Sequence, residues 1–134
     1  MTISNFDDLL ATARQQPTGQ RLLLVFATAE LPENPTPEQR AGFEQGAGGA
    51  LVPAMCVEKT PDEIVDFVSL KREATQFEMP WRVIFVSSLS GTVDQAPSSE
   101  EAEPALQHMV DSIKMGTFAN MAAFNVEGNA IVVE

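Results

Sequence analysis

The sequence is poor in the side chains on which most catalytic and metal sites depend. It contains one cysteine (Cys56), one histidine (His108) and no tyrosine. A single thiol can neither close an internal disulfide nor supply a multi-thiolate metal site. No His-x-x-His, Cys-x-x-Cys or His-Glu-x-x-His spacing is present. We therefore expect the chain to hold neither a metal nor a cofactor.

Basic residues are scarce as well. The chain has 8 lysines and arginines against 19 aspartates and glutamates, which gives a net charge of −11. A surface of this sign repels the phosphates of nucleic acids and of anionic membranes, so we expect no nucleic-acid and no membrane partner. Solubility is sufficient to explain the charge, and a basic partner protein or nucleic-acid mimicry are the alternatives.

Long apolar runs and a leader segment are also missing. No apolar run approaches the roughly 18 residues of a membrane span. Residues 1–8 have neither the basic region nor the apolar core of a secretory signal peptide. Together with the lack of disulfides, these features predict a cytoplasmic protein.

The chain does contain enough apolar residues for a packed core. Its 134 residues are 44% hydrophobic, which suits one domain spanning residues 1–134. Unbroken apolar runs predict three strands, the first of them buried on both faces. Amphipathic stripes that end at glycine or proline predict the helices. The predicted strands cover residues 22–27, 50–57 and 81–86, and the predicted helices cover residues 5–14, 37–46, 61–75 and a stretch that ends at Gly116.

The order of these elements predicts the fold class. Strands separated by helices imply right-handed crossovers and a largely parallel sheet. Residues 121–124 and 130–133 flank a glycine-containing turn and predict an antiparallel hairpin. We therefore expect an α/β fold with a compact mixed sheet, mostly parallel crossovers and a C-terminal antiparallel hairpin. Pro53 indicates that the second strand lies at an edge or carries a bulge.

Capping residues mark the expected helix starts. Ser4 is expected to cap the first helix. Thr36 and Thr60 each begin a capping-box pattern with proline at the first helical position. Pro104 is expected in the first turn of the last helix or at a kink within it.

Cys56 and His108 could act as nucleophile and base only if they met. A reactive cysteine needs a base or a positive environment to hold its thiolate. His108 lies opposite the apolar stripe of its helix, which includes Leu106 and Met109, so we expect it to face water. We predict that the two groups are too far apart to act together and that Cys56 is a small apolar strand residue.

The least ordinary stretch is the serine-rich segment 87–92. It follows the third predicted strand, and open α/β sheets bind ligands at the carboxyl ends of their strands. The end of the second strand would bring a thiol and an amine nearby. The candidate ligand-binding residues are Cys56, Lys59, Ser88, Ser90 and Thr92. In this hypothesis Lys59 pairs with an anionic ligand and the hydroxyls orient it; an ordinary loop is the alternative.

Two further segments invite a functional interpretation. Residues 46–49 are rich in glycine, but they precede a strand and no lysine follows in the required place, so they do not predict a phosphate-binding loop. Residues 31–49 form a long connection rich in proline and glycine. Because long connections are often functional, this segment is a candidate lid or partner-docking loop.

Several segments form a pattern that extends over nearly the whole chain. They are AELP (29–32), TPEQR (36–40), GGALVP (48–53), MCVEKTPDE (55–63) and APSSEEAE (96–103). This pattern resembles a family of small proteobacterial proteins labelled ribonucleotide reductase subunit alpha. The catalytic subunit of that reductase uses a radical-forming cysteine and a separate cysteine pair, whereas this chain has Cys56 alone. The resemblance therefore implies an accessory role rather than reductase activity.

Two hypotheses of function remain open. The first is a non-enzymatic binding or interaction protein of the cytoplasm, with an unknown protein partner or a second copy in a homodimer. The alternative is a small ligand-binding or enzymatic domain that uses the loop after the third strand. The absence of a reactive constellation favours the first hypothesis.

Overall fold

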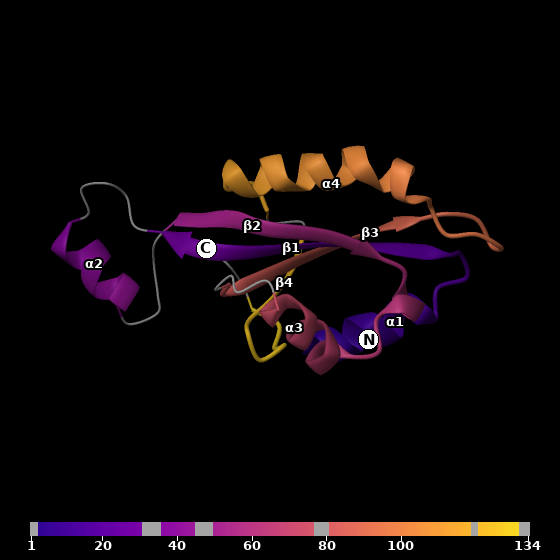
Figure 1. Cartoon of the computed structure of the whole chain (residues 1–134), viewed down its shortest axis with the longest axis horizontal. Helices are drawn as coiled ribbons and strands as arrows, with labels where there is room; N and C mark the ends of the chain where they lie inside the picture. The colour runs from indigo at the N-terminus through magenta and orange to yellow at the C-terminus, as the bar shows by residue number, and fades with distance from the viewer. Residues whose placement is uncertain (1–2, 31–35, 45–49, 77–80, 119–120, 132–134) are drawn as a thin grey trace.

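The computed structural model describes residues 3–30, 36–44, 50–76, 81–118 and 121–131 (Figure 1). Within these ranges the strands form one four-stranded sheet, and the helices connect or flank them. In chain order the elements are α1 (Phe6–Arg14), β1 (Gln20–Glu30), α2 (Pro37–Glu44), β2 (Ala50–Lys59), the short 3-10 helix η1 (Pro61–Glu63), α3 (Phe67–Thr75), β3 (Val83–Ser90), α4 (Ser99–Lys114) and β4 (Ala122–Phe124). Among the described residues, no helix combines the length and apolarity that crossing a membrane requires.

The sheet is antiparallel throughout, and the prediction of mostly parallel crossovers is wrong. The strand order is β2-β1-β3-β4, and each neighbouring pair is antiparallel. Because β2 and β3 both run opposite to β1, they share a direction but lie on either side of it. The apolar run of β1 indicates burial on both faces. Such burial is typical of a parallel strand, but a central antiparallel strand between two helix layers is buried on both faces as well. The run therefore carried no information about strand direction.

Two helix layers enclose the sheet (Figure 1), with α4 on one face and α1 and α3 on the other. Side chains of β1 alternate between the two layers. Leu22, Leu24 and Phe26 pack in the core beneath α1 and α3. Leu23 and Val25 pack in the core beneath α4. We call these two sides the α1/α3 face and the α4 face.

The second strand follows the expectation from its proline. β2 lies at the edge of the described sheet, and its register against β1 shifts between Phe26 and Ala27. Phe26 is opposite Met55 whereas Ala27 is opposite Pro53, so Ala54 is the extra residue of a bulge. The prediction of an edge position or a bulge is confirmed, and β2 has both.

The helix predicted from Thr60 to residue 75 is split in two. The backbone N–H of Thr60 donates to the Glu63 carboxylate (2.9 Å), but the turn that follows is only η1. Ile64 is extended (φ −110°, ψ 117°) and buried. A new cap, Asp66, then starts α3 by accepting from the backbone of Ser69 (2.8 Å). Burial of Ile64 in the core takes the chain out of helical geometry between the two pieces.

Other boundaries also differ from the expectations. Asn5, not Ser4, caps α1, and its side chain accepts from the backbone of Asp8 (2.8 Å). Pro104 lies inside α4 rather than in its first turn. Helix α2 begins at Pro37, as its capping pattern predicts. Residues 31–35 and 45–49, which belong to the candidate lid and to the glycine-rich stretch, lie outside the described residues.

The C-terminal turn closes against α1 and α3: the backbone N–H of Phe6 donates to the carbonyl of Gly128 (2.8 Å), and Gly128 lies against the ring of Phe67. Asn125 donates to the carbonyl of Asn129 (3.0 Å), and Gly128 has a left-handed backbone (φ 83°). The return arm makes only isolated bridges, Phe124 with Ala130 and Asn129 with Asn5. Beyond residue 131 the predicted arm lies outside the described residues.

Candidate functional site

The strand registers separate the predicted site residues. Cys56 is opposite Val25, so it lies on the α4 face. Lys59 and Ser88 are both opposite Leu22, so they flank it on the α1/α3 face. Because the sheet stands between these two sets, Cys56 does not contribute to a site with Lys59 and Ser88.

Cys56 and His108 are not hydrogen-bonded to each other in the described structure. Both residues are exposed, Cys56 on β2 and His108 on α4. The water-facing position predicted for His108 is confirmed.

Lys59 is already paired within the fold. Its amine lies 3.3 Å from the carboxylate of Glu73 on α3. The lysine therefore ties β2 to α3, and any anionic ligand would have to compete with Glu73 for it.

The serine-rich segment is strand rather than loop up to Ser90. Ser88 pairs with Leu22 and Ser90 with Gln20 across the β1–β3 ladder. Serine does not favour strands, but here both residues lie in the regular β1–β3 ladder and are exposed. The prediction of a loop over this stretch is therefore wrong as far as Ser90, because Ser88 and Ser90 belong to the strand β3.

Thr92 lies in a tight turn after β3. Its carbonyl accepts from the backbone of Gly19 (2.8 Å), and its own N–H donates to the carbonyl of Gln95 (2.8 Å). A Cβ at Gly19 would come within 2.5 Å of the Ala96 nitrogen. The turn therefore packs directly on the backbone before β1, and Thr92 serves that packing.

Gln20 is a buried polar residue that sequence reasoning missed. Its side chain is 7% exposed. The amide nitrogen donates to the hydroxyl of Ser90 (2.9 Å) and to the hydroxyl of Thr18 (3.0 Å), and the Ser90 hydroxyl donates to the amide oxygen (3.3 Å). A glutamine at the start of an apolar run is an available signal, because a buried amide needs partners.

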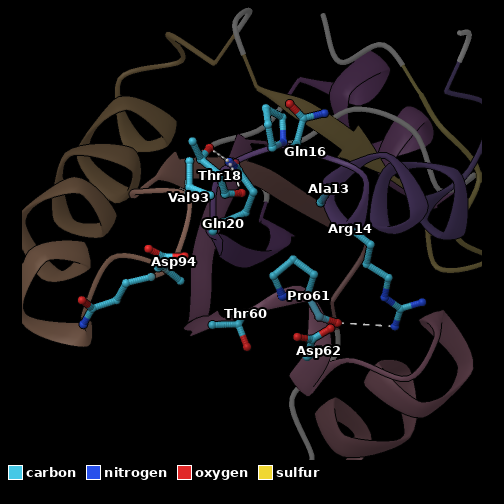
Figure 2. A pocket seen from close by; sticks show the side chains of 14 residues that line it. Ala13, Arg14, Gln16, Thr18, Gln20, Thr60, Pro61, Asp62, Val93 and Asp94 are labelled. Carbon is cyan, nitrogen blue, oxygen red and sulfur yellow. Dashed lines mark hydrogen bonds between the residues drawn. The ribbon is translucent and has the colours of Figure 1, made fainter.

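Two hollows meet at Gln20. The first, which we call the end hollow, has a volume of about 340 Å³ and lies where α1, η1 and the turn after β3 converge (Figure 2). Charged side chains line it, namely Arg14, Asp62 and Asp94. Arg14 donates to the carbonyl of Ile64 (2.5 Å) and so holds the connection after η1.

The second, which we call the β3 hollow, has a volume of about 420 Å³ and lies between α1 and β3. Its sheet side includes Leu22, Val86, Ser88 and Ser90, and its helix side includes Leu9 and Thr12. Gln16 and Gln20 line both hollows. Two of the predicted site residues, Ser88 and Ser90, are thus brought together in one concave surface, with a volume typical of small-molecule pockets.

The perturbed carboxyl groups lie outside the β3 hollow. Hydrogen bonds from the backbone and hydroxyl of Thr60, together with the charges of Arg21 and Lys59, lower the pKa of Glu63. The backbone and side chain of Ser69 lower the pKa of Asp66, with help from Arg72. These shifts come from helix capping and do not indicate acid–base chemistry. In the described part of the chain, no group of three or more His, Cys, Asp or Glu side chains could hold a metal ion.

Comparison with known proteins gives no family assignment. No family model matches the chain, and neither a curated protein nor a solved structure matches it significantly. Function is therefore inferred from the residues of the two hollows.

Proposed function

We propose that the chain is a non-enzymatic binding protein that takes a small molecule in the β3 hollow. The observation that carries this proposal is the hollow itself, about 420 Å³ between α1 and β3, with Ser88 and Ser90 on its sheet side. Hydroxyl groups on a regular strand are held in place before a ligand arrives, which reduces the entropy lost on binding.

The fixed amide of Gln20 supports the proposal. It is buried, and it bonds to Ser90 in β3 and to Thr18 before β1. These bonds hold the wall between the two hollows in one arrangement. A wall of this kind favours a preformed site over one that must be assembled by the ligand.

Binding without catalysis is favoured by the chemistry of the lining. A nucleophile needs a neighbouring base or cation, and the described lining of the β3 hollow contains serine, threonine and glutamine but no cysteine, histidine or charged residue. An accessory role, which the family resemblance implies, agrees with a site that needs no reactive group.

The test is a fragment screen read by amide chemical shifts of the labelled protein. Fragments of neutral, anionic and cationic type are screened against the wild type and against Ser88→Ile, which fills the hollow from the strand while keeping a strand-favouring side chain. Cys56→Ser is the matched control on the opposite face. Hits should shift the amides of Ser88 and Ser90 and be lost in Ser88→Ile but kept in Cys56→Ser. Hits confined to other surfaces would contradict the proposal.

Self-association is the second candidate function. It is favoured by the position of β2, a ten-residue strand at the edge of the described sheet. A free edge can pair with a strand of a second copy, although Pro53 and the bulge at Ala54 weaken its first half. Light scattering across a concentration series tests this, and a strict monomer at high concentration would exclude it.

The net charge disfavours a nucleic-acid or membrane partner. With a charge of −11, the protein has no electrostatic attraction for phosphate backbones or anionic lipid surfaces. A nucleic-acid partner would require a local basic patch, and two of the eight cations, Arg21 and Lys59, are paired with carboxylates.

A further inference from the structure

We propose that the ligand of the β3 hollow is an uncharged molecule with an apolar body and a hydrogen-bond donor such as an amide N–H or a hydroxyl. This inference rests on the proposed function and names the chemical class that the site takes. Three observations carry it: the charge of the lining, its remaining hydrogen-bonding capacity and its apolar part.

The first observation is that none of the described residues lining the β3 hollow is charged. Charged residues make up 20% of the chain, and the adjoining end hollow is lined by Arg14, Asp62 and Asp94. An ion that enters the β3 hollow would lose part of its hydration without meeting an opposite charge, which is unfavourable. An anion would in addition be repelled by the net charge of the protein.

The second observation concerns which hydrogen-bonding groups are left unused. The Ser90 hydroxyl donates its proton to the Gln20 amide, so it can only accept a further bond. The amide nitrogen of Gln16 donates one N–H to the Thr12 carbonyl (3.1 Å), which leaves its second N–H as a donor and its oxygen as an acceptor. The Ser88 hydroxyl is exposed and can donate or accept. Among these three side chains, three oxygens can accept and two groups, the second Gln16 N–H and the Ser88 hydroxyl, can donate, so a ligand that donates is the better match.

The third observation is the apolar part of the lining. Leu9 of α1, Leu22 of β1 and Val86 of β3 border the hollow, together with Ala122 of β4. Leu22 and Val86 belong to the buried core, and Leu9 and Ala122 pack against it. Leu9 and Ala122 are only half-buried, so a ligand with an apolar body that covers them gains the free energy of removing apolar surface from water.

The experiment uses three probes that share an indole ring and differ in charge: indole-3-acetamide, indole-3-acetate and tryptamine. Each is titrated into the labelled full-length protein, and the reporters are the amides of Ser88 and Ser90 and the side-chain amide of Gln20. The acetamide is expected to bind at these reporters at least about tenfold more tightly than either charged probe, because an ion is poorly solvated there. Tryptamine, if it binds, is expected at Asp62 and Asp94 in the end hollow.

Two variants test whether the Ser88 hydroxyl bonds the ligand and whether the ligand binds on this face of the sheet. Ser88→Ala removes the hydroxyl that is free to bond the ligand and should weaken acetamide binding about threefold to tenfold. Cys56→Ala, on the other face of the sheet, is the matched control and should leave binding unchanged. Both substitutions replace an exposed strand side chain, so their effects on folding are comparable.

The outcomes separate the two proposals. If a charged probe shifts the Ser88 and Ser90 amides as tightly as the acetamide does, the inference about charge is overturned while the binding site stands. If Ser88→Ala leaves acetamide binding unchanged, the assignment of the Ser88 hydroxyl as the hydrogen-bond partner of the ligand is overturned. If none of the three probes perturbs Ser88, Ser90 or Gln20, both the inference and the proposed function fall.

Discussion

The guanidinium of Arg21 on β1 donates to the carboxylate of Glu58 on β2, and this pair connects the sheet to the start of α4. Arg21 also donates through Nε to the carbonyl of Pro97, and the hydroxyl of Ser99 donates to the same Glu58 carboxylate (2.8 Å). The side chains of Arg21 and Glu58 are 15% and 24% exposed. Their mutual bond is therefore only partly screened by water.

We predict that Arg21→Met destabilises the protein by about 2 kcal/mol, because it leaves the half-buried Glu58 carboxylate without its main partner. Urea unfolding measures the change. The matched control is Lys59→Met, which breaks the ion pair with Glu73, a residue that is 56% exposed. An exposed pair contributes less than about 1 kcal/mol. Equal losses in the two variants would contradict a special role for the Arg21–Glu58 pair.

Much of the local structure could be predicted from the sequence, whereas the sheet topology could not. The apolar run of β1, the proline of β2 and the start of α2 each led to the correct element. Strand direction was not predictable, because burial on both faces produces the same pattern in a central antiparallel strand as in a parallel one. Only the pairing of residues far apart in the chain, such as Val25 with Cys56 and Phe85, decides it.

The candidate site was predictable only in part. Ser88 and Ser90 were singled out, and both line the β3 hollow. Cys56 was grouped with them because it lies near the end of a predicted strand. Successive side chains of a strand point to opposite faces of the sheet, and Cys56 points to the α4 face. The wall that Gln20 forms between the two hollows was not predicted. Gln20 bonds to both Thr18 and Ser90, and Ser90 comes close to it only when β1 and β3 pair.

Gly128 is predicted to be the more sensitive of two glycines with left-handed backbones. At Gly128 (φ 83°) an added Cβ would lie 2.8 Å from the ring of Phe67, whereas at Gly116 (φ 76°) it would meet no atom within 4 Å. Both alanine variants lose about 1 kcal/mol to backbone strain. Gly128→Ala should lose at least about 1 kcal/mol more, because the aromatic core around Phe6 and Phe67 must shift. Thermal unfolding of the two variants checks this, and similar melting temperatures would refute it.

The two capping carboxylates predict a loss of stability in acid. Hydrogen bonds from Thr60 lower the pKa of Glu63 below its ordinary value of 4.5, and hydrogen bonds from Ser69 lower the pKa of Asp66 below its ordinary value of 3.8. Since both groups are more acidic in the folded state, their contribution is complete above these ordinary values. It declines as the pH falls through them toward the folded-state pKa values.

The variant Asp66→Asn isolates this effect at α3. Asparagine is also a good N-cap but does not titrate. The free energy of unfolding of the wild type should therefore exceed that of Asp66→Asn more at about pH 6 than at about pH 3. Urea unfolding at the two pH values makes the comparison. A gap between wild type and variant that is independent of pH would mean that ionisation of Asp66 does not support the cap.

The hydrogen bonds between Gln20 and Ser90 should appear as a coupling energy in a double-mutant cycle. Gln20→Ala and Ser90→Ala each remove one side of the interaction, so the double variant should lose about 1 kcal/mol less than the sum of the single losses. Ser87→Ala is the matched control, because Ser87 is the neighbouring half-buried serine of β3 and makes no hydrogen bond with Gln20 in the described structure. Gln20→Ala and Ser87→Ala should be additive to within about 0.5 kcal/mol. If Ser90 were also additive with Gln20, the wall between the two hollows would not be held by this bond, and a preformed β3 hollow would lose its main support.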